Sequence, residues 1–210
     1  MAIPKLSCVK AVIDMLSFSN TKLKRDGIAA FSIPAGSTCP NKGICAKGCY
    51  AMQGFFLMPN VREALKRNYL ETRGSQFASK MHAEIQKKKP KMIRIHASGD
   101  FYNRDYAIKW INIALINPKV RFYAYTKMVS LFKTLILPSN FTVIYSYGGK
   151  QDSLIKANDR HSKVFPSFAD MTKAKYKDTT TNDINAIGRN KKIGLVYHGA
   201  KSKQFDSIAM

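Results

Sequence analysis

Three cysteines lie close together in a short segment that is otherwise rich in glycine and polar residues. Cys39, Cys45 and Cys49 form a C-x5-C-x3-C pattern in the stretch STCPNKGICAKGCY. Glycine adopts backbone angles that other residues avoid, so Gly43 and Gly48 allow the segment to turn its sulfurs toward one point. Three thiolates at one point need a cation to balance their charge. We therefore predict a metal centre; the alternatives are three unrelated buried thiols, or a transient disulfide that leaves an odd thiol.

The spacing of these cysteines favours an iron–sulfur cluster over zinc. Structural zinc takes four protein ligands, usually in pairs of the C-x2-C type, which this segment lacks. Clustered cysteines in one loop suit a [4Fe-4S] cube, in which three thiolates leave one iron for a fourth ligand or a small molecule. Zinc stays an alternative, because soft thiolates bind both. The candidates for a fourth ligand are Cys8, His96, Asp100 and His198.

Other polar side chains follow predicted strands and are candidates for a catalytic or binding role. His96 and Asp100 lie in the string HASGD, Lys127 follows FYAYT, and His198 follows IGLVY. A histidine that leaves a strand is more often structural than a ligand, but the position of His96 at the presumed active edge keeps it a candidate. Asp100 could cap the next helix or bind a hydroxyl or amine of a ligand. Lys127 could pair with Asp100 or with an anionic ligand.

The elements that must position these residues alternate between strand and helix. We expect strands at 28–33, 92–95, 120–125, 141–147 and 193–197, and a short one at 164–165. Helical periodicity covers 61–88, with Asn60 as its cap and Gly74 as a break, and also 106–115 and 128–137. This alternation predicts a mainly parallel sheet, either an open sheet or a partial (β/α) barrel. The functional groups of such folds gather at the carboxyl ends of the strands.

The chain reads as one α/β domain over residues 1–210. Within it, residues 37–54 form the cysteine loop, and the polar, lysine-rich stretch at about 171–192 is expected to be a mobile loop. We find no internal repeat and no second domain.

Composition and charge exclude several classes of protein. The 210 residues include 35 Lys and Arg against 13 Asp and Glu, a formal charge of +22. With 45% hydrophobic residues, the chain is too apolar for a disordered polycation. It has no apolar run long enough to span a membrane and no secretory signal, so we expect reduced cysteines in a cytosol. The charge favours a polyanionic partner such as nucleic acid, or simply a solvated surface.

Several motifs resemble the bacteriophage family called gene product 88. They cover nearly the whole chain in order: SFSNTKL (17–23), SIPAGSTCP (32–40), CYAMQG (49–54), PNVREALKRN (59–68), RIHASGDFYNRDY (94–106), PKVRFYAYTK (118–127) and LVYHGAKS (195–202). The resemblance implies a phage origin, hence action in the cytoplasm of an infected bacterium. It also implies family cysteines at the positions of Cys39, Cys45 and Cys49.

A second similarity concerns architecture alone. A loop of three cysteines after the first strand and a Ser98-Gly99-Asp100 turn after the next resemble radical S-adenosylmethionine enzymes. That similarity implies a partial-barrel fold and a cluster on Cys39, Cys45 and Cys49. The cysteine spacing here departs from the C-x3-C-x2-C pattern of those enzymes, so use of S-adenosylmethionine stays open.

Three hypotheses follow. The first is a phage [4Fe-4S] protein, with an enzymatic, redox or small-molecule role at the open iron. The second is a basic nucleic-acid-binding protein stabilised by zinc. The third is a virion or host-takeover adaptor without chemistry, which the gathering of polar groups at strand ends disfavours.

Overall fold

The computed structural model describes residues 14–197, in which helices cover a twisted and mainly parallel sheet. The strands are β1 (Leu16–Ser17), β2 (Ile28–Phe31), β3 (Met92–Ile95), β4 (Arg121–Thr126), β5 (Phe141–Ser146), β6 (His161–Phe165), β7 (Lys177–Asp178) and β8 (Lys192–Val196). The α-helices are α1 (Thr21–Arg25), α2 (Pro59–Arg73), α3 (Phe77–Lys88), α4 (Arg104–Leu115), α5 (Val129–Lys133) and α6 (Phe168–Lys173). The 3-10 helices are η1 (Ile44–Ala46), η2 (Tyr50–Met52), η3 (Gly54–Leu57), η4 (Asp152–Leu154) and η5 (Asp183–Ile187).

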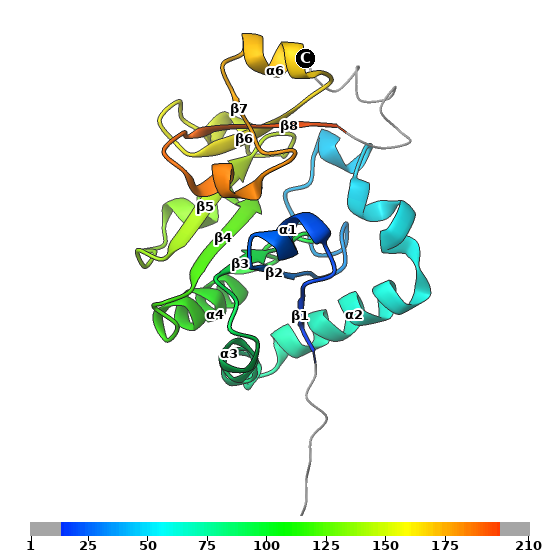
Figure 1. The fold of residues 1–210 in the computed structure, drawn as a ribbon, viewed down its shortest axis with the longest axis vertical. Coiled ribbons are helices and arrows are strands. Elements are labelled where there is room, and N and C mark those ends of the chain that lie inside the picture. Colours follow the sequence, from blue (N-terminus) through cyan, green and yellow to red (C-terminus); the bar gives the residue numbers. More distant parts are fainter. Residues whose placement is uncertain (1–13, 198–210) are drawn as a thin grey trace, which may run out of the picture.

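The strands lie in the order β1-β2-β3-β4-β5-β6-β8-β7. Every neighbouring pair is parallel except β1 with β2. Figure 1 shows the sheet turning from β2 and β3 in the middle of the molecule to β6 and β8 at its top. The sheet is open, with β1 and β7 at its edges, so of the two expected architectures the open parallel sheet is the one found.

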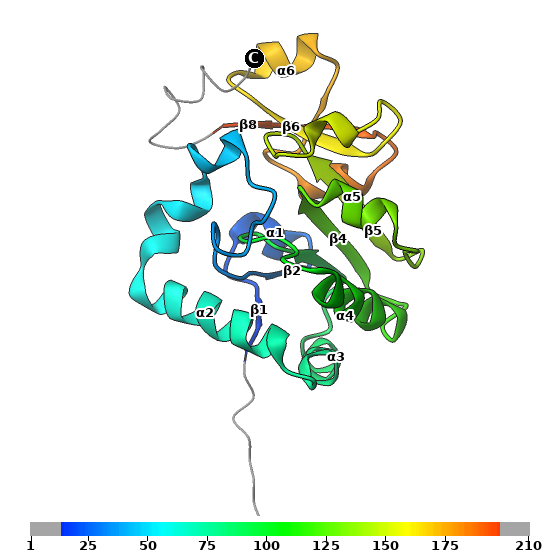
Figure 2. The same ribbon diagram turned by 180° about the vertical axis from the view of Figure 1, so that it is seen from behind.

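Both faces of the sheet are buried, as the crossover helices of a parallel sheet require. On one face, Phe31 of β2 packs its ring against Phe77 of α3 and Trp110 of α4, with centroids 5.8 and 5.0 Å apart. Figure 2 shows α3 and α4 on this side. On the other face, Leu23 of α1 and Ala186 of η5 join a smaller cluster of buried residues. Because neighbouring strand residues point to opposite faces, the apolar runs in β2 and β3 serve both clusters.

The helices follow the expected periodicity, with differences at their ends. Asn103 caps α4 by accepting a hydrogen bond from the backbone of Tyr106 at 2.9 Å. Helix α2 begins at Pro59, so Asn60 is its second residue and not its cap, since proline suits the first turn of a helix. The helix expected over 128–137 is shorter, because α5 ends at Lys133.

The stretch at 171–192, expected to be a mobile loop, contains regular elements. It includes the end of α6, strand β7 and the 3-10 helix η5. Its Asp183 and Thr179 are buried. The expectation of an irregular loop was therefore wrong. Composition alone does not show whether a carboxylate such as that of Asp183 is exposed or is buried with charged partners.

Candidate metal and ligand site

The cysteine loop lies across the carboxyl ends of several strands. After β3, the carbonyl of Ala97 accepts a hydrogen bond from the hydroxyl of Tyr50. After β5, the carbonyl of Gly148 accepts one from the backbone of Cys45 at 3.1 Å. After β8, the hydroxyl of Tyr197 donates to the carbonyl of Gly48 at 3.1 Å. The loop is thus held against the carboxyl ends of β3, β5 and β8 and covers the edge where a parallel sheet binds its ligands.

Two glycines allow the loop and the strand ends to approach each other closely. A Cβ atom at Gly43 would lie 2.9 Å from the carbonyl oxygen of Gly148. A Cβ atom at Gly99 would lie 2.4 Å from a side-chain carbon of Ile33, and the backbone φ of Gly99 is +88°. Only glycine meets both conditions at position 99 without strain.

Cys39, Cys45 and Cys49 are half-buried free thiols that line one cavity of about 250 Å³. Burial raises the pKa of Cys39 to about 11, and repulsion from Asp100, Cys49 and Cys45 adds to the shift. Burial is also the main cause of the raised pKa of Cys49, to which Cys45 contributes. Cys39 is therefore affected by both other thiols, and Cys49 by Cys45.

The donor set fits a soft metal centre in chemistry, although its geometry is not that of a single bound ion. Thiolates bind iron–sulfur clusters and zinc. Within residues 14–197, no three His, Cys, Asp or Glu side chains are arranged to hold one metal ion. Two of the candidate ligands, Cys8 and His198, lie outside the described residues.

His96 lies in the wall of the same cavity and is almost fully buried. Its Nε2 is 2.8 Å from the hydroxyl of Tyr106 on α4, and its Nδ1 has no hydrogen-bond partner within residues 14–197. Burial lowers the pKa of His96 to about 3, so the imidazole is neutral at physiological pH. One ring nitrogen thus has a structural partner, and the other is buried without one in the part of the chain that the structure describes.

Asp100 and Lys127 come together at the cavity, but through the backbone of Lys127. The carboxylate of Asp100 accepts hydrogen bonds from Lys127 N at 2.9 Å and from Thr126 Oγ1 at 2.6 Å. The ammonium of Lys127 instead lies 2.9 Å from Ser146 Oγ and contacts the carbonyls of Ser146 and Tyr147. Burial raises the pKa of Asp100 in spite of these bonds. Asp100 therefore fixes the turn after β3, while Asn103 caps the helix.

The chain matches a known protein family over most of its length. The family model described as "Gene product 88" matches residues 14–208. The chain belongs to the gene product 88 family. The resemblance expected from its motifs is thereby confirmed.

Two curated members of the gene product 88 family come from mycobacteriophages. The chain is 28% identical over 186 residues to the "Gene 88 protein" of Mycobacterium phage L5, covering 81% of this chain and 78% of that protein. It is 32% identical over 117 residues to the "Gene 88 protein" of Mycobacterium phage D29, covering 49% of each. No solved structure matches, so the similarity to radical S-adenosylmethionine enzymes stays a prediction. In the described part of the chain, no helix has the length and apolarity needed to cross a bilayer.

The cavity of this gene product 88 family member has further polar lining that the sequence analysis missed. It includes Arg94 of β3 and Lys163 of β6, together with Tyr125 and Tyr197. Arg94 could have been predicted as a site residue, because it is a charged residue inside the apolar strand sequence MIRI. In a parallel sheet with two covered faces, such a residue needs a buried partner or a ligand.

Proposed function

We propose that the protein holds a [4Fe-4S] cluster through Cys39, Cys45 and Cys49. One iron then remains open to a small molecule in the cavity. Because its relatives are phage proteins, we further propose that it acts in the cytoplasm of an infected bacterium.

The observation that carries the proposal is that all three thiols line one cavity at the carboxyl edge of the sheet. A zinc ion needs its ligands within about 2.0–2.3 Å of one point. In a cube each thiolate binds a different iron, so the sulfurs surround a body instead of meeting at a point. Three thiols that line one cavity therefore suit a cube, which each of them could bind at a different iron.

The charges at the cysteine end of the cavity also suit a cluster. A cube of charge 2+ with three thiolates carries a net charge of −1. Lys42 and Lys127 line the same cavity and supply positive charge. Lys127 lowers the pKa of Cys49 and so opposes the effect of burial on that thiol. Thiolate formation would be helped by this lysine when a cluster binds.

An enzymatic role is the extension of this proposal. When bound, a cluster with an open iron supplies one-electron chemistry and a coordination position for a ligand. The chain supplies a cavity wall that includes His96, whose imidazole is kept neutral by the lowered pKa. The cysteine loop after β2, the Ser98-Gly99-Asp100 turn after β3 and the open parallel sheet support a radical S-adenosylmethionine-like architecture. S-adenosylmethionine is one candidate ligand within this proposal.

Cysteine-to-serine variants test the ligand set. Cys39→Ser, Cys45→Ser and Cys49→Ser, purified without oxygen, are expected to lose the charge-transfer absorption of the cluster and most of their iron. Cys8→Ser is the matched control, because it removes the one cysteine outside the loop. It is expected to keep the absorption and iron content of the unaltered protein. Equal iron in all four variants, or equal loss in all four, would reject these ligands.

A further inference from the structure

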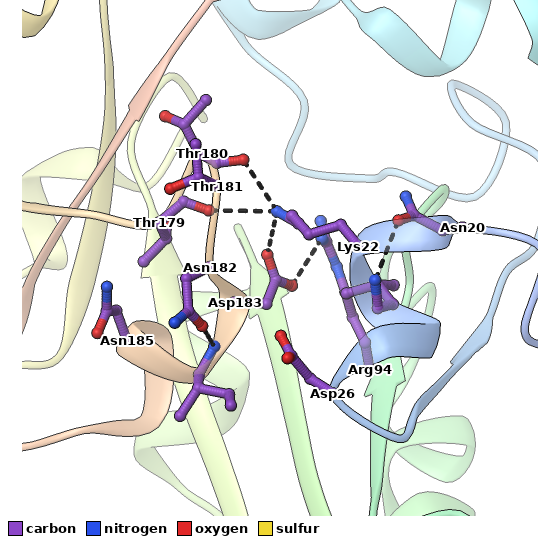
Figure 3. Close-up of polar contacts among 12 residues, drawn as sticks. Asn20, Lys22, Asp26, Arg94, Thr179, Thr180, Thr181, Asn182, Asp183 and Asn185 are labelled. Atoms are coloured by element: carbon purple, nitrogen blue, oxygen red, sulfur yellow. Dashed lines mark hydrogen bonds and ion pairs between the residues drawn. The ribbon is translucent and has the colours of Figure 1, made fainter.

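A buried network beside the cavity contains two cations and one carboxylate. Asp183 of η5, whose side chain is fully buried, lies 2.6 Å from Lys22 Nζ of α1 and 3.0 Å from Arg94 Nη1 of β3. It also accepts a hydrogen bond from the hydroxyl of Tyr123 at 2.7 Å. Figure 3 shows Lys22 and Arg94 reaching Asp183 from two different elements. Buried charges are stable when they are paired, and here one positive charge is left over.

Arg94 is the cation of this network that lines the cavity, so the unpaired positive charge lies there. The ammonium of Lys22 is fully engaged, because it also bonds to the carbonyls of Thr179 and Thr180 at 3.2 Å each. The guanidinium of Arg94 lies over the ring of Tyr125, 5.1 Å from its centroid. Its Nε is buried and has no hydrogen-bond partner among the described residues. A guanidinium has five N–H donors, so Arg94 keeps donors for a ligand.

The surroundings of Arg94 favour an anion with an apolar body. The charged residues that line the described cavity are four cations and one carboxylate, namely Lys42, Arg94, Lys127, Lys163 and Asp100. The carboxylate of Asp100 is already engaged with backbone and threonine donors. Four tyrosines line the cavity as well, namely Tyr50, Tyr125, Tyr147 and Tyr197. Tyr125 thus places an aromatic ring at the cavity wall directly beside the guanidinium of Arg94.

Arg94 and the cysteines share this cavity but act on different groups. Tyr50 directly follows Cys49 in the loop and lines the same cavity as Arg94. Lys127 is the cation that acts on the Cys49 thiol. Lys127 therefore supplies the positive charge next to the cysteines, and Arg94 is available to bind a second ligand.

We propose that Arg94 binds the carboxylate or phosphate of a small organic anion, whose apolar part lies against the tyrosines of the cavity. The anion is the substrate class of the site, and this role rests on the proposed function; the binding of the anion does not require the cluster. A guanidinium is suited to this task because its planar fork matches both carboxylate and phosphate oxygens.

Three small probes of similar size test the proposal by calorimetry at physiological salt. Benzoate and phenyl phosphate carry the two anionic groups, and benzamide is the neutral match. At least one anion is expected to bind about tenfold or more tightly than benzamide. Tighter binding of benzoate identifies a carboxylate ligand, and tighter binding of phenyl phosphate identifies a phosphate ester. Equal affinity for benzamide and both anions, or no binding of either anion, overturns the proposal.

Variants in the buried network separate the binding role from a structural one. Arg94→Gln is expected to weaken anion binding about tenfold or more, whereas Lys22→Gln is expected to leave it within twofold. Both variants remove one cation from Asp183, but Lys22 does not line the cavity. Arg94→Lys keeps the charge next to Asp183 and removes the planar fork, so it is used if Arg94→Gln unfolds; it too is expected to lose affinity. Unchanged affinity in the Arg94 variants, or equal loss in Lys22→Gln, contradicts the proposal.

The same titrations in Cys39→Ser distinguish the two proposals. Anion binding that persists there while iron is lost supports the Arg94 site independently of the cluster. A cluster that assembles normally in Arg94→Gln, together with no anion binding in the unaltered protein, leaves the proposed function standing and rejects the anion site alone.

Discussion

The carboxylate of Asp100 accepts a hydrogen bond from the backbone N–H of Lys127 at 2.9 Å, while the ammonium of Lys127 turns to Ser146. Asp100 thereby joins the end of β3 to the end of β4, and Lys127 joins the end of β4 to the end of β5. These two residues fix three neighbouring strand ends against one another beneath the cysteine loop.

Asp100→Asn is expected to destabilise the protein. The carboxylate accepts hydrogen bonds from Thr126, from Lys127 and from the backbone of Phe101, and an amide cannot accept from all three donors. We expect the free energy of unfolding in urea to fall by about 1–3 kcal/mol. Asp14→Asn is the control, because Asp14 is 68% exposed in its contact with Lys88, and it should change stability by less than about 1 kcal/mol. Equal effects of the two substitutions would contradict this role for Asp100.

His96 makes stability depend on pH. Burial lowers its pKa to about 3 in the folded protein, against an ordinary value of 6.5. Between these values the unfolded chain binds a proton that the folded protein does not, so the free energy of unfolding falls as the pH falls below 6.5. The loss from this group reaches about 1.4 kcal/mol per pH unit.

Urea unfolding at pH 7.5 and pH 5.0 measures this contribution. His96→Asn is the reference, because asparagine tolerates the positive φ of 64° at this position and does not titrate. The unaltered protein should lose more stability than His96→Asn over this interval. Identical losses would show that the histidine is protonated, or exposed, in the folded state.

Gly99→Ala is expected to be strongly destabilising. The added Cβ would meet Ile33 at 2.4 Å and would also need a φ of +88°. The matched control is Gly54→Ala, where φ is +56° and no atom lies within 4 Å of the added Cβ. We expect the control to lose about 1–2 kcal/mol from the left-handed backbone alone, and Gly99→Ala to lose clearly more because of the collision. Thermal unfolding of both variants checks the difference.

Asp183→Asn is expected to be among the most destabilising single substitutions on this face of the sheet. It removes the charge that pairs with both Lys22 and Arg94 and leaves two cations facing each other. Loss of one partner of a buried ion pair costs about 3–5 kcal/mol. Asp26→Asn removes a carboxylate whose partner Arg25 is 62% exposed, so it should cost less than about 1 kcal/mol. Similar unfolding free energies for both variants would contradict the buried network.

Much of this fold follows from local sequence patterns. The apolar runs that became β2, β3, β4, β5 and β8 are short and bounded by turn residues, and the helices between them keep a period near 3.6. A parallel arrangement of those strands is enough to bring Cys39, His96, Asp100 and Lys127 to one edge. The sequence therefore predicts that polar groups gather there, and these four residues do line one cavity, while His198 lies outside the described residues.

The contacts between distant segments could not be predicted. Arg94 and Asp183 are 89 residues apart, and neither position alone indicates a partner. The polar composition of 171–192 predicts a solvated loop, yet one buried carboxylate fixes η5 against the sheet. The pairing of Asp100 with the backbone of Lys127 depends on exact strand register, which hydrophobic patterns do not determine. Net charge is equally uninformative here, because it does not separate a cationic cavity from a basic surface.

The central claim is a [4Fe-4S] cluster on the three cysteines of the loop. Iron and acid-labile sulfide analysis of the unaltered protein, isolated without oxygen, tests it most directly. The account predicts about four iron and four sulfide per chain in a brown protein. A colourless protein that carries zinc without sulfide, or no metal at all after anaerobic reconstitution with iron and sulfide, would contradict it.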